Sequence, residues 1–411
     1  MAVLVTSKSG DISACRAAGE FGADFRQALL ERSVSCRSEE AEGLFDEACQ
    51  ALETLAAAND ERVARLERIV DQTAASADPV RLGELCDDFY AELYDHFGCY
   101  GSAVAFYHFS THFLHALAGS LHRYALKRLG PSGKRLPDMM PLALGPAGRR
   151  EFSPFCPLQV ALVFGRAANG DLDEVSRYCD ILQEGFATCG LRVNGDIALV
   201  NSSWRGSLPE WSRRLEQGLA RGKRRELVEL LRWADHEALL QTPAMEGEFR
   251  ALVLSQLQQS RRAIGDLVSR LLDLSNGLGI MGGWRLERGG PYSGLFRLFE
   301  HGLLPLSATV TALALINRVD AVEIPQRIRA LLVHRALDVD AAERLLQSWH
   351  TLNELRLMRE REMFPGRDSA AAMYLDVAAL DEKTRLMLRE ALETIDNVQR
   401  RVSAAYRVVE E

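Results

Sequence analysis

A glycine-containing turn and the apolar run after it hold the residue types best suited to chemistry in this chain. The sequence Gly-x-x-Gly-Arg-x-Glu is formed by Gly145, Gly148, Arg149 and Glu151. Its glycines permit a tight turn, and its arginine is suited to gripping a phosphate. Residues 160–164 then read Val-Ala-Leu-Val-Phe, a short continuous apolar run that is typical of a buried strand. We therefore expect a phosphate-gripping turn beside a sheet.

Three further segments resemble one bacterial family. The segment Trp204-Arg205-Gly206-Ser207-Leu208, followed by Trp211, is similar to a signature of signal-transduction nucleotidyltransferases related to the uridylyltransferase that modifies the nitrogen regulator PII. Residues 121–126 resemble the helix that leads into that family's glycine turn. Residues 302–306 and the helices after them resemble its substrate-binding domain. The resemblance covers roughly residues 105 to 405 and implies a polymerase-beta-like nucleotidyltransferase domain followed by a substrate-binding domain.

The catalytic positions of that family are altered in this chain. The family pattern is Gly-Ser, then Gly-Arg-x-Glu, then Asp-x-Asp at the start of the buried strand. Pro146 stands at the Ser position, Pro157 and Gln159 stand at the two Asp positions, and Phe299 lies near a usual Lys. Two aspartates at i and i+2 on a strand point to the same side. They can hold the divalent metal that nucleotidyl transfer requires, because Mg²⁺ prefers carboxylate oxygens.

The altered positions lead us to expect no catalytic residue at Pro157 or Gln159. No cofactor is expected, and Mg²⁺ with a nucleoside triphosphate would bind only if the protein is active. The first functional expectation is a catalytically degenerate relative of the PII-uridylyltransferase that acts in regulation or signal transduction. It would do so through a regulatory protein partner, or by sensing a nucleotide or another small-molecule ligand.

Two alternatives remain open at this stage. One is an active metal-dependent nucleotidyltransferase with displaced carboxylates, for which Asp196 with Asp171 or Asp173 would supply the ligands. Asp171 and Asp173 also suit the start of a helix, where carboxylates cap the chain and favour the helix dipole. The other alternative is a helical protein-interaction scaffold in which the α/β domain is only a folded core.

The residues expected to contact a ligand fall into two groups. The nucleotide-binding candidates are Gly145, Gly148, Arg149 and Glu151. A cleft between the α/β domain and the C-terminal helices would be lined by Arg149, Arg205, Arg285 and Asp196, because ligand pockets favour domain interfaces. Asp196 is the candidate for a retained third carboxylate.

His108, His112 and His115 share one face of a predicted helix, since they are spaced at i, i+4 and i+7. Imidazoles at that spacing could bind a transition metal. We favour the alternative that they hydrogen-bond to a neighbouring helix, because no His-Glu-x-x-His pattern supplies a general base. We therefore expect no metal ligands in this chain.

Composition excludes several classes of protein. The chain has 411 residues, 47% hydrophobic and 26% charged, which is ordinary for a globular protein. A net charge of −8 argues against nucleic acid as a partner. The eight cysteines lack Cys-x-x-Cys spacing and, with no secretory signal, are expected to be reduced thiols. No membrane partner is expected, and the expected location is cytoplasmic.

The sequence predicts an α+β fold that is mostly helical. A small nucleotidyltransferase-like mixed sheet domain at residues 129–222 is expected between an N-terminal helical region, 1–128, and a C-terminal helical domain, 223–411. Within the sheet domain, strands are predicted at 140–144, 160–164 and 196–201, with a helix over 171–188.

Overall fold

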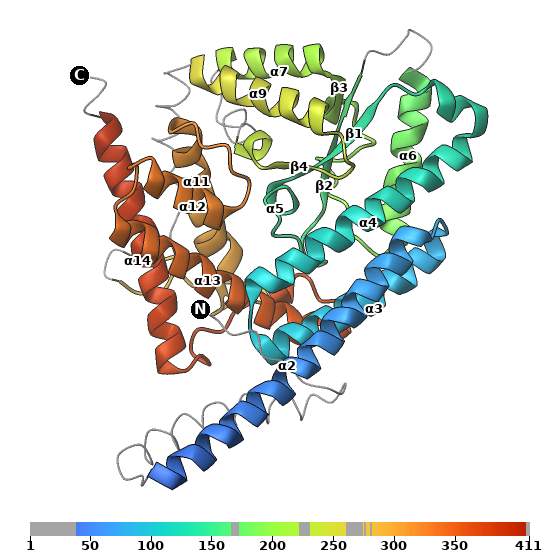
Figure 1. The fold of residues 1–411 in the computed structure, drawn as a ribbon. Coiled ribbons are helices and arrows are strands. Elements are labelled where there is room, and N and C mark those ends of the chain that lie inside the picture. Colours follow the sequence, from blue (N-terminus) through green and yellow to red (C-terminus); the bar gives the residue numbers. More distant parts are fainter. Residues whose placement is uncertain are drawn as a thin grey trace.

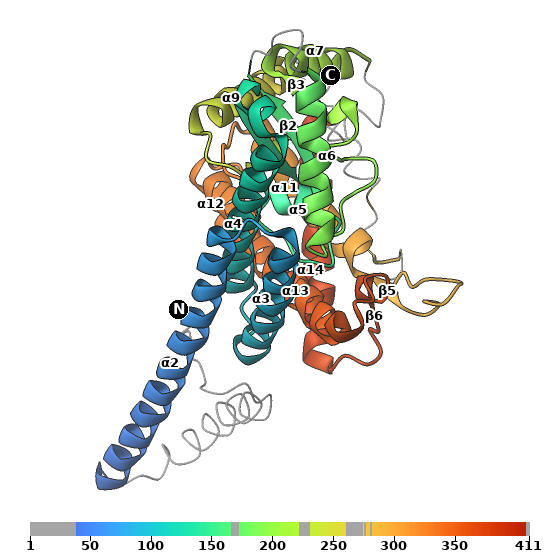
Figure 2. The same ribbon diagram turned by 90° about the vertical axis from the view of Figure 1, so that its right-hand side faces the viewer.

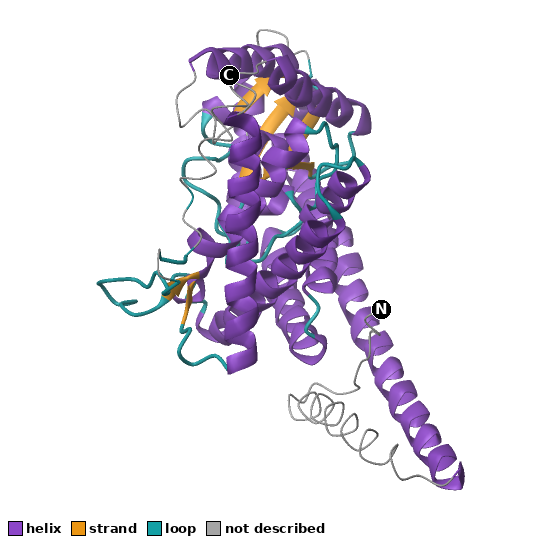
Figure 3. Ribbon diagram, turned by 90° about the vertical axis from the view of Figure 1, so that its left-hand side faces the viewer, coloured by secondary structure: helices purple, strands orange, loops and turns teal. Residues whose placement is uncertain are grey.

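The computed structural model describes residues 38–165, 172–221, 231–259, 274, 277–279 and 282–407. Helices dominate this part of the chain, and the named strands form one four-stranded and one two-stranded sheet (Figure 3). The prediction of a mostly helical α+β fold is confirmed.

Three long helices make up the described N-terminal region. One end of helix α2 (Ser38–Ala75) reaches away from the body of the molecule, and the rest of it packs with α3 (Pro79–Tyr100) and α4 (Ala103–Leu129) (Figures 1 and 2). The turn between α3 and α4 is set by Gly101 in a left-handed conformation and by Ser102, whose side chain accepts a hydrogen bond from the Ala105 N–H. Helix α4 continues into a 3₁₀ turn (Gly130–Arg135) that leads to the sheet.

The four-stranded sheet has the order β3-β2-β1-β4. Strands β1 (Met139–Leu144) and β2 (Gln159–Phe164) are antiparallel, and the segment that joins them begins with the short helix α5 (Gly145–Gly148). Strand β3 (Arg205–Ser207) runs parallel to β2, and β4 (His236–Ala238) runs antiparallel to β1. The predicted arrangement of strand, glycine turn and buried strand is therefore confirmed.

The two faces of the sheet belong to two separate cores. One face, which includes Ala143 and Val160, joins the large core with α4, α6 (Leu172–Thr188) and the C-terminal helices. The other face, which includes Leu142 and Ala161, packs on α7 (Leu208–Arg221) and α9 (Pro243–Gln259). Both faces are covered because alternate side chains of each strand point to opposite sides.

The strand predicted at residues 196–201 is wrong. Residues 196–200 form bends and a turn, and Asn201 caps the 3₁₀ helix Ser202–Trp204. The cause is local, because the Asn194 side chain accepts hydrogen bonds from the N–H groups of Asp196 and Ile197 and closes a turn there. The strand beside β2 is instead β3, within the Trp-Arg-Gly-Ser segment. At the other edge, β4 lies past residue 222, so the sheet extends beyond the expected limit of its domain.

The C-terminal region is built mainly from helices. They are α11 (Leu304–Ile316), α12 (Ile324–Val333), α13 (Val339–Met363) and α14 (Glu382–Arg407), with a π turn at Phe299–Leu303 and 3₁₀ turns at Phe364–Gly366 and Ala371–Met373. Strands β5 (Phe296–Arg297) and β6 (Tyr374–Leu375) form the small sheet. The segment Phe299–Ile316 is long and apolar enough to cross a membrane, but 72% of it is buried within the protein.

The cysteines differ from expectation at one position. Cys86, Cys156, Cys179 and Cys189 are free and buried. Cys99, however, is disulfide-bonded, so the expectation that all cysteines are reduced thiols is wrong there.

Candidate functional site

The glycine turn is held by the backbone of Asp235, the residue before β4. Gly145 has a φ of +61°, a conformation that favours glycine, and its N–H donates to the Asp235 carbonyl over 3.0 Å. At Gly148, a β-carbon would lie 2.0 Å from the same carbonyl oxygen. Glycine is therefore favoured at residue 145 by its positive φ and required at residue 148 by the close approach of Asp235, whatever ligand the turn holds.

One of the two positions where the family resembled by this sequence carries aspartates, residue 159, lies at this turn. Gln159 is the first residue of β2 and is paired in register with Leu144, which directly precedes the turn. A β-carbon on Gly145 would lie 3.1 Å from Gln159 Oε1, so the amide stands against the turn. That Oε1 is buried and has no hydrogen-bond partner among the described residues. Pro157 is exposed.

These residues do not fit a Mg²⁺ site of the carboxylate-pair type. Pro157 has no side-chain oxygen, and Gln159 offers one neutral amide oxygen in place of a charged carboxylate. Pro146 removes a backbone N–H from the turn as well. A strand, a glycine turn and a second strand are thus present, and neither Pro157 nor Gln159 carries a carboxylate.

Arg149 and Glu151 point into the protein. Arg149 is 8% exposed, and its guanidinium donates to Glu151 Oε2 over 3.0 Å and to Asp235 Oδ2 over 2.7 Å. Burial disfavours the charged guanidinium, but Glu151 and Asp235 outweigh that effect and raise the pKa of Arg149. The side chains of these two nucleotide-binding candidates therefore form ion pairs with groups inside the protein.

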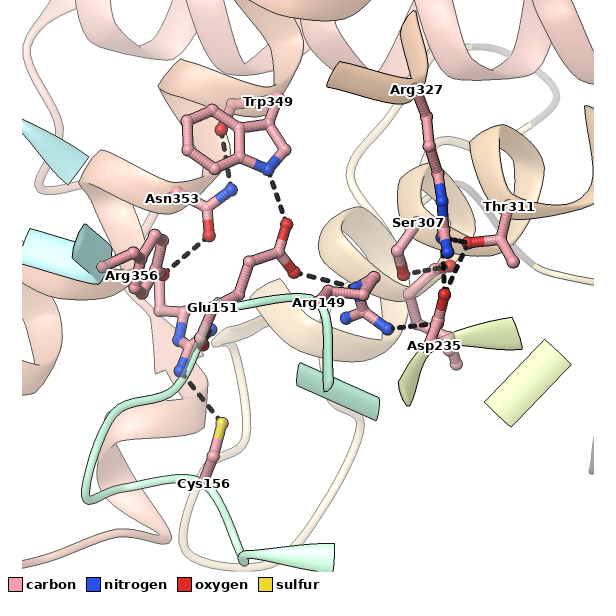
Figure 4. A network of polar contacts seen from close by, with 12 residues as sticks. Arg149, Glu151, Cys156, Asp235, Ser307, Thr311, Arg327, Trp349, Asn353 and Arg356 are labelled. Atoms are coloured by element: carbon pink, nitrogen blue, oxygen red, sulfur yellow. Dashed lines mark hydrogen bonds and ion pairs between the residues drawn. The ribbon is translucent and has the colours of Figure 1, made fainter. Parts of the chain in front are cut away.

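Asp235 joins the turn to the C-terminal helices (Figure 4). Its Oδ1 accepts from Arg327 of α12 over 2.5 Å and from the Thr311 hydroxyl of α11 over 3.1 Å. Arg327 also donates to the Ala234 carbonyl over 2.9 Å. Arg327 is 2% exposed, so this ion pair is shielded from water and locks the two regions together.

Glu151 connects the turn to α13 in the same way. Its Oε1 accepts from the indole N–H of Trp349 over 2.7 Å (Figure 4). Two turns further along α13, Arg356 donates to the Glu151 carbonyl over 3.3 Å and to the Ser153 hydroxyl over 2.7 Å. Glu360 accepts from both Arg356 and Ser153 and so satisfies the buried guanidinium. The segment between the glycine turn and β2 is therefore bound to the C-terminal region by buried polar contacts.

Arg150 makes a third connection, at the surface. It is not a glycine, yet its φ is +61°. Its guanidinium contacts Glu237 of β4 at 2.7 Å and Glu323, which precedes α12, at 3.1 Å. Successive residues of the motif, Arg149 to Glu151, thus reach three different parts of the chain.

The remaining cleft candidates lie apart from these contacts. Arg205 donates to the Ser176 hydroxyl and the Val200 carbonyl, both within the α/β domain. Arg285 donates to the Leu278 carbonyl in its own loop. Asp196 is exposed in the turn described above, Asp173 lies in the first turn of α6, and Asp171 is outside the described residues.

The histidines of α4 have separate surroundings. His108 and His112 have ring centroids 4.4 Å apart, and His115 Nε2 lies 3.7 Å from Glu237 Oε1. Burial and the positive charge of Arg150 and His112 lower the pKa of His115 to about 4. Across the part of the chain that the structure describes, no group of three or more His, Cys, Asp or Glu side chains could hold a metal ion.

Sequence reasoning missed Asp235, Arg327, Trp349 and Arg356. Two of them carried a usable signal: Arg327 lies between Ile324 and Ile328 on the apolar face of α12, and Arg356 is flanked by apolar residues of α13. A guanidinium on an apolar helix face predicts a buried partner. Asp235 carried no such local signal.

Two family comparisons match the chain. Residues 88–225 match the family described as "Putative nucleotidyltransferase DUF294". Residues 261–406 match "Putative nucleotidyltransferase substrate binding domain". A comparison with curated proteins finds no match.

Proposed function

Because the chain belongs to the nucleotidyltransferase family that these two matches describe, we propose that it is a catalytically degenerate member that acts in regulation. The functional type that we propose for it resembles that of the uridylyltransferase that modifies PII. The protein works through contacts with a regulatory partner, or by sensing a ligand, rather than by transferring nucleotides. The observation that carries this proposal is the Gln159 amide standing against Gly145, where a metal-binding carboxylate would be needed.

The buried network supports a regulatory role for the glycine turn. Arg149 and Glu151, which would face a nucleotide in an active site, are instead engaged by Asp235 and Trp349. Removing metal-held stabilisation of a transferring phosphate costs several kcal/mol, about a thousandfold in rate or more. The polar side chains of the motif thus serve to fix the two regions of the protein relative to each other.

Restoring the missing groups tests the proposal. We would compare the wild-type protein with Pro146→Ser/Pro157→Asp/Gln159→Asp, and with a control, Pro146→Ser/Pro157→Asn/Gln159→Asn, which adds polar groups without charge. Each is mixed with labelled UTP or ATP and with Mg²⁺ or Mn²⁺. Binding is measured by equilibrium dialysis, and transfer by incorporation of label into protein and small-molecule acceptors.

The expected result is metal-dependent triphosphate binding by the aspartate variant alone. Metal-dependent transfer by the wild type would overturn the proposal and favour the active enzyme with displaced carboxylates. Equal triphosphate binding by all three proteins would show that the substitutions at residues 146, 157 and 159 do not decide nucleotide binding, which also contradicts the proposal.

A further inference from the structure

A cavity of about 100 Å³ lies away from the contacts of the glycine turn. It is enclosed by α3, by the segment that leads from the glycine turn to β2, by the residues after α6 and by the turn after α13. Its inner wall is formed by Cys86, Tyr90, Phe155, Cys189 and Leu191, all of which are buried. An enclosed apolar cavity of roughly 150 Å³ accepts a benzene ring. This cavity is smaller but opens to solvent, so it can take part of a small ring while the rest of the ring lies at its mouth.

The inner wall is uncharged. Burial raises the pKa of the Cys189 thiol to about 12 and raises that of Cys86 well above its ordinary value. The Tyr90 hydroxyl is engaged by the Ser110 hydroxyl at 3.2 Å, which leaves the ring of Tyr90 to line the cavity. Neutral thiols and aromatic rings make an interior suited to an apolar group.

The mouth of the cavity carries an excess of positive charge. Its lining residues, all of them described, include two arginines, Arg192 and Arg367, and one carboxylate, Asp87. Arg367 is ion-paired with Asp87, while an N–H group of Arg192 donates a hydrogen bond to the Phe155 carbonyl over 2.5 Å. A guanidinium has five N–H donors in a fixed fork, so Arg192 retains the geometry to meet a carboxylate.

The backbone at the mouth holds Arg367 in an unusual conformation. Arg367 has a φ of +48°, although it is not a glycine. Gly190 faces it, and a β-carbon on Gly190 would lie 3.3 Å from Arg367 Nη1. The guanidinium lies 6.0 Å from the centroid of the Phe364 ring. Strained residues of this kind cluster at ligand clamps, because the surrounding structure has to hold them in place.

We propose that this cavity binds a small aromatic carboxylate. The ring lies among Tyr90, Phe155 and Cys189, and the carboxylate is held at the mouth by Arg192 and Arg367. The site joins Phe155, which lies between Glu151 and Gln159, to the turn that follows α13. A ligand there contacts both the α/β domain and the C-terminal region, and the assignment stands whether or not the protein transfers nucleotides.

Calorimetric titration of the full-length protein with sodium benzoate tests the site. Benzyl alcohol has the same ring without the charge, and benzylamine reverses the charge. The variants are Arg192→Gln and Arg367→Gln at the mouth and Cys189→Leu in the interior. Arg177→Gln, an exposed arginine of α6 outside the cavity, is the matched control. Melting temperatures confirm that each variant is folded.

We expect benzoate to bind more tightly than benzyl alcohol, and benzylamine not to bind. Arg192→Gln should weaken benzoate binding about tenfold or more, because a charge-assisted hydrogen bond is lost. Cys189→Leu should abolish it by filling the cavity, and Arg177→Gln should leave it unchanged. Absence of benzoate binding to the wild type would overturn the proposal, as would binding that Arg192→Gln and Arg367→Gln leave unchanged. The mouth variants decide the matter if Cys189→Leu does not fold.

Discussion

Gly148 and Asp235 approach so closely that a β-carbon at residue 148 would lie 2.0 Å from the Asp235 carbonyl oxygen. The obstructing atom is backbone in a buried segment, so it cannot move aside as a flexible side chain would. The sequence predicts that Gly148 belongs to a nucleotide-binding turn. Packing against the segment that leads into β4 is by itself enough to require glycine at this residue.

Gly148→Ala should destabilise the protein by about 3 kcal/mol or more, since overpacking of this severity forces the backbone apart. Urea unfolding followed by circular dichroism measures the loss. Gly247→Ala is the control, because Gly247 lies within α9 and a β-carbon there meets nothing within 4 Å. It should be neutral or stabilising by about 0.5–1 kcal/mol. Equal stability of the two variants would contradict the packing argument.

Arg327→Met should lower the free energy of unfolding by about 3–5 kcal/mol, because it leaves the buried carboxylate of Asp235 with fewer partners. Arg329→Met on the same helix removes an exposed arginine and should change it by less than about 0.5 kcal/mol. Chemical unfolding of both variants gives the comparison. A small effect of Arg327→Met would mean that Arg149 and Thr311 alone satisfy Asp235.

His236 should make the protein less stable in acid. It is 1% exposed, and burial together with nearby arginines lowers its pKa to about 3. The Trp233 carbonyl can only accept a hydrogen bond, so the proton of the neutral ring is on Nδ1, at 2.6 Å from that oxygen. Since the folded-state pKa lies below the unfolded value, the unfolded chain binds more protons as pH falls. The contribution of His236 to the free energy of unfolding is therefore fully present above about pH 6.5. It falls by about 1.4 kcal/mol per pH unit as the pH is lowered to about 3.

His236→Asn keeps a donor for the Trp233 carbonyl and removes the titrating ring. Its unfolding free energy should depend less steeply on pH between 6 and about 4, by close to one bound proton, even if the variant is less stable at pH 8. Urea unfolding at several pH values measures the slope. His334→Asn, at an exposed position, serves as control. An unchanged slope in His236→Asn would contradict the assignment.

Arg150 allows strain and ion pairing to be separated. Arg150→Ala loses the contacts to Glu237 and Glu323 but keeps a β-carbon at a φ of +61°, whereas Arg150→Gly loses the same contacts and relieves the strain. We expect the glycine variant to be about 1 kcal/mol more stable than the alanine variant. Thermal unfolding of the pair measures this difference. If alanine proves the more stable, the left-handed conformation is not a source of strain at this residue.

The elements that the sequence predicted well are those with local causes. Strands β1 and β2 and the turn between them follow from apolar runs and two glycines, and α6 was predicted to within one residue of its start. β3 was missed as a strand because it is only three residues long and contains Gly206. β4 was missed because it is equally short and carries Glu237 in its middle.

In the candidate site, too, only the features with local causes could be predicted from the sequence. The position of Gln159 beside Gly145 follows from the two apolar runs, because pairing them as adjacent antiparallel strands brings the end of β1 beside the start of β2. The partners of Arg149 and Glu151 could not, since Asp235 and Trp349 lie 86 and 198 residues further along the chain. Such pairings are decided by how the C-terminal helices dock, and no local pattern in the sequence records that.

Strand β4 also determines where the protein can be truncated. The first family match ends at residue 225, yet β4 and the Asp235 carbonyl that holds Gly145 lie beyond it. A fragment expressed to that boundary would leave one edge of β1 without its partner strand. Unpaired edges recruit strands from other molecules, so such a fragment would aggregate, and the two matched regions have to be produced as one continuous polypeptide.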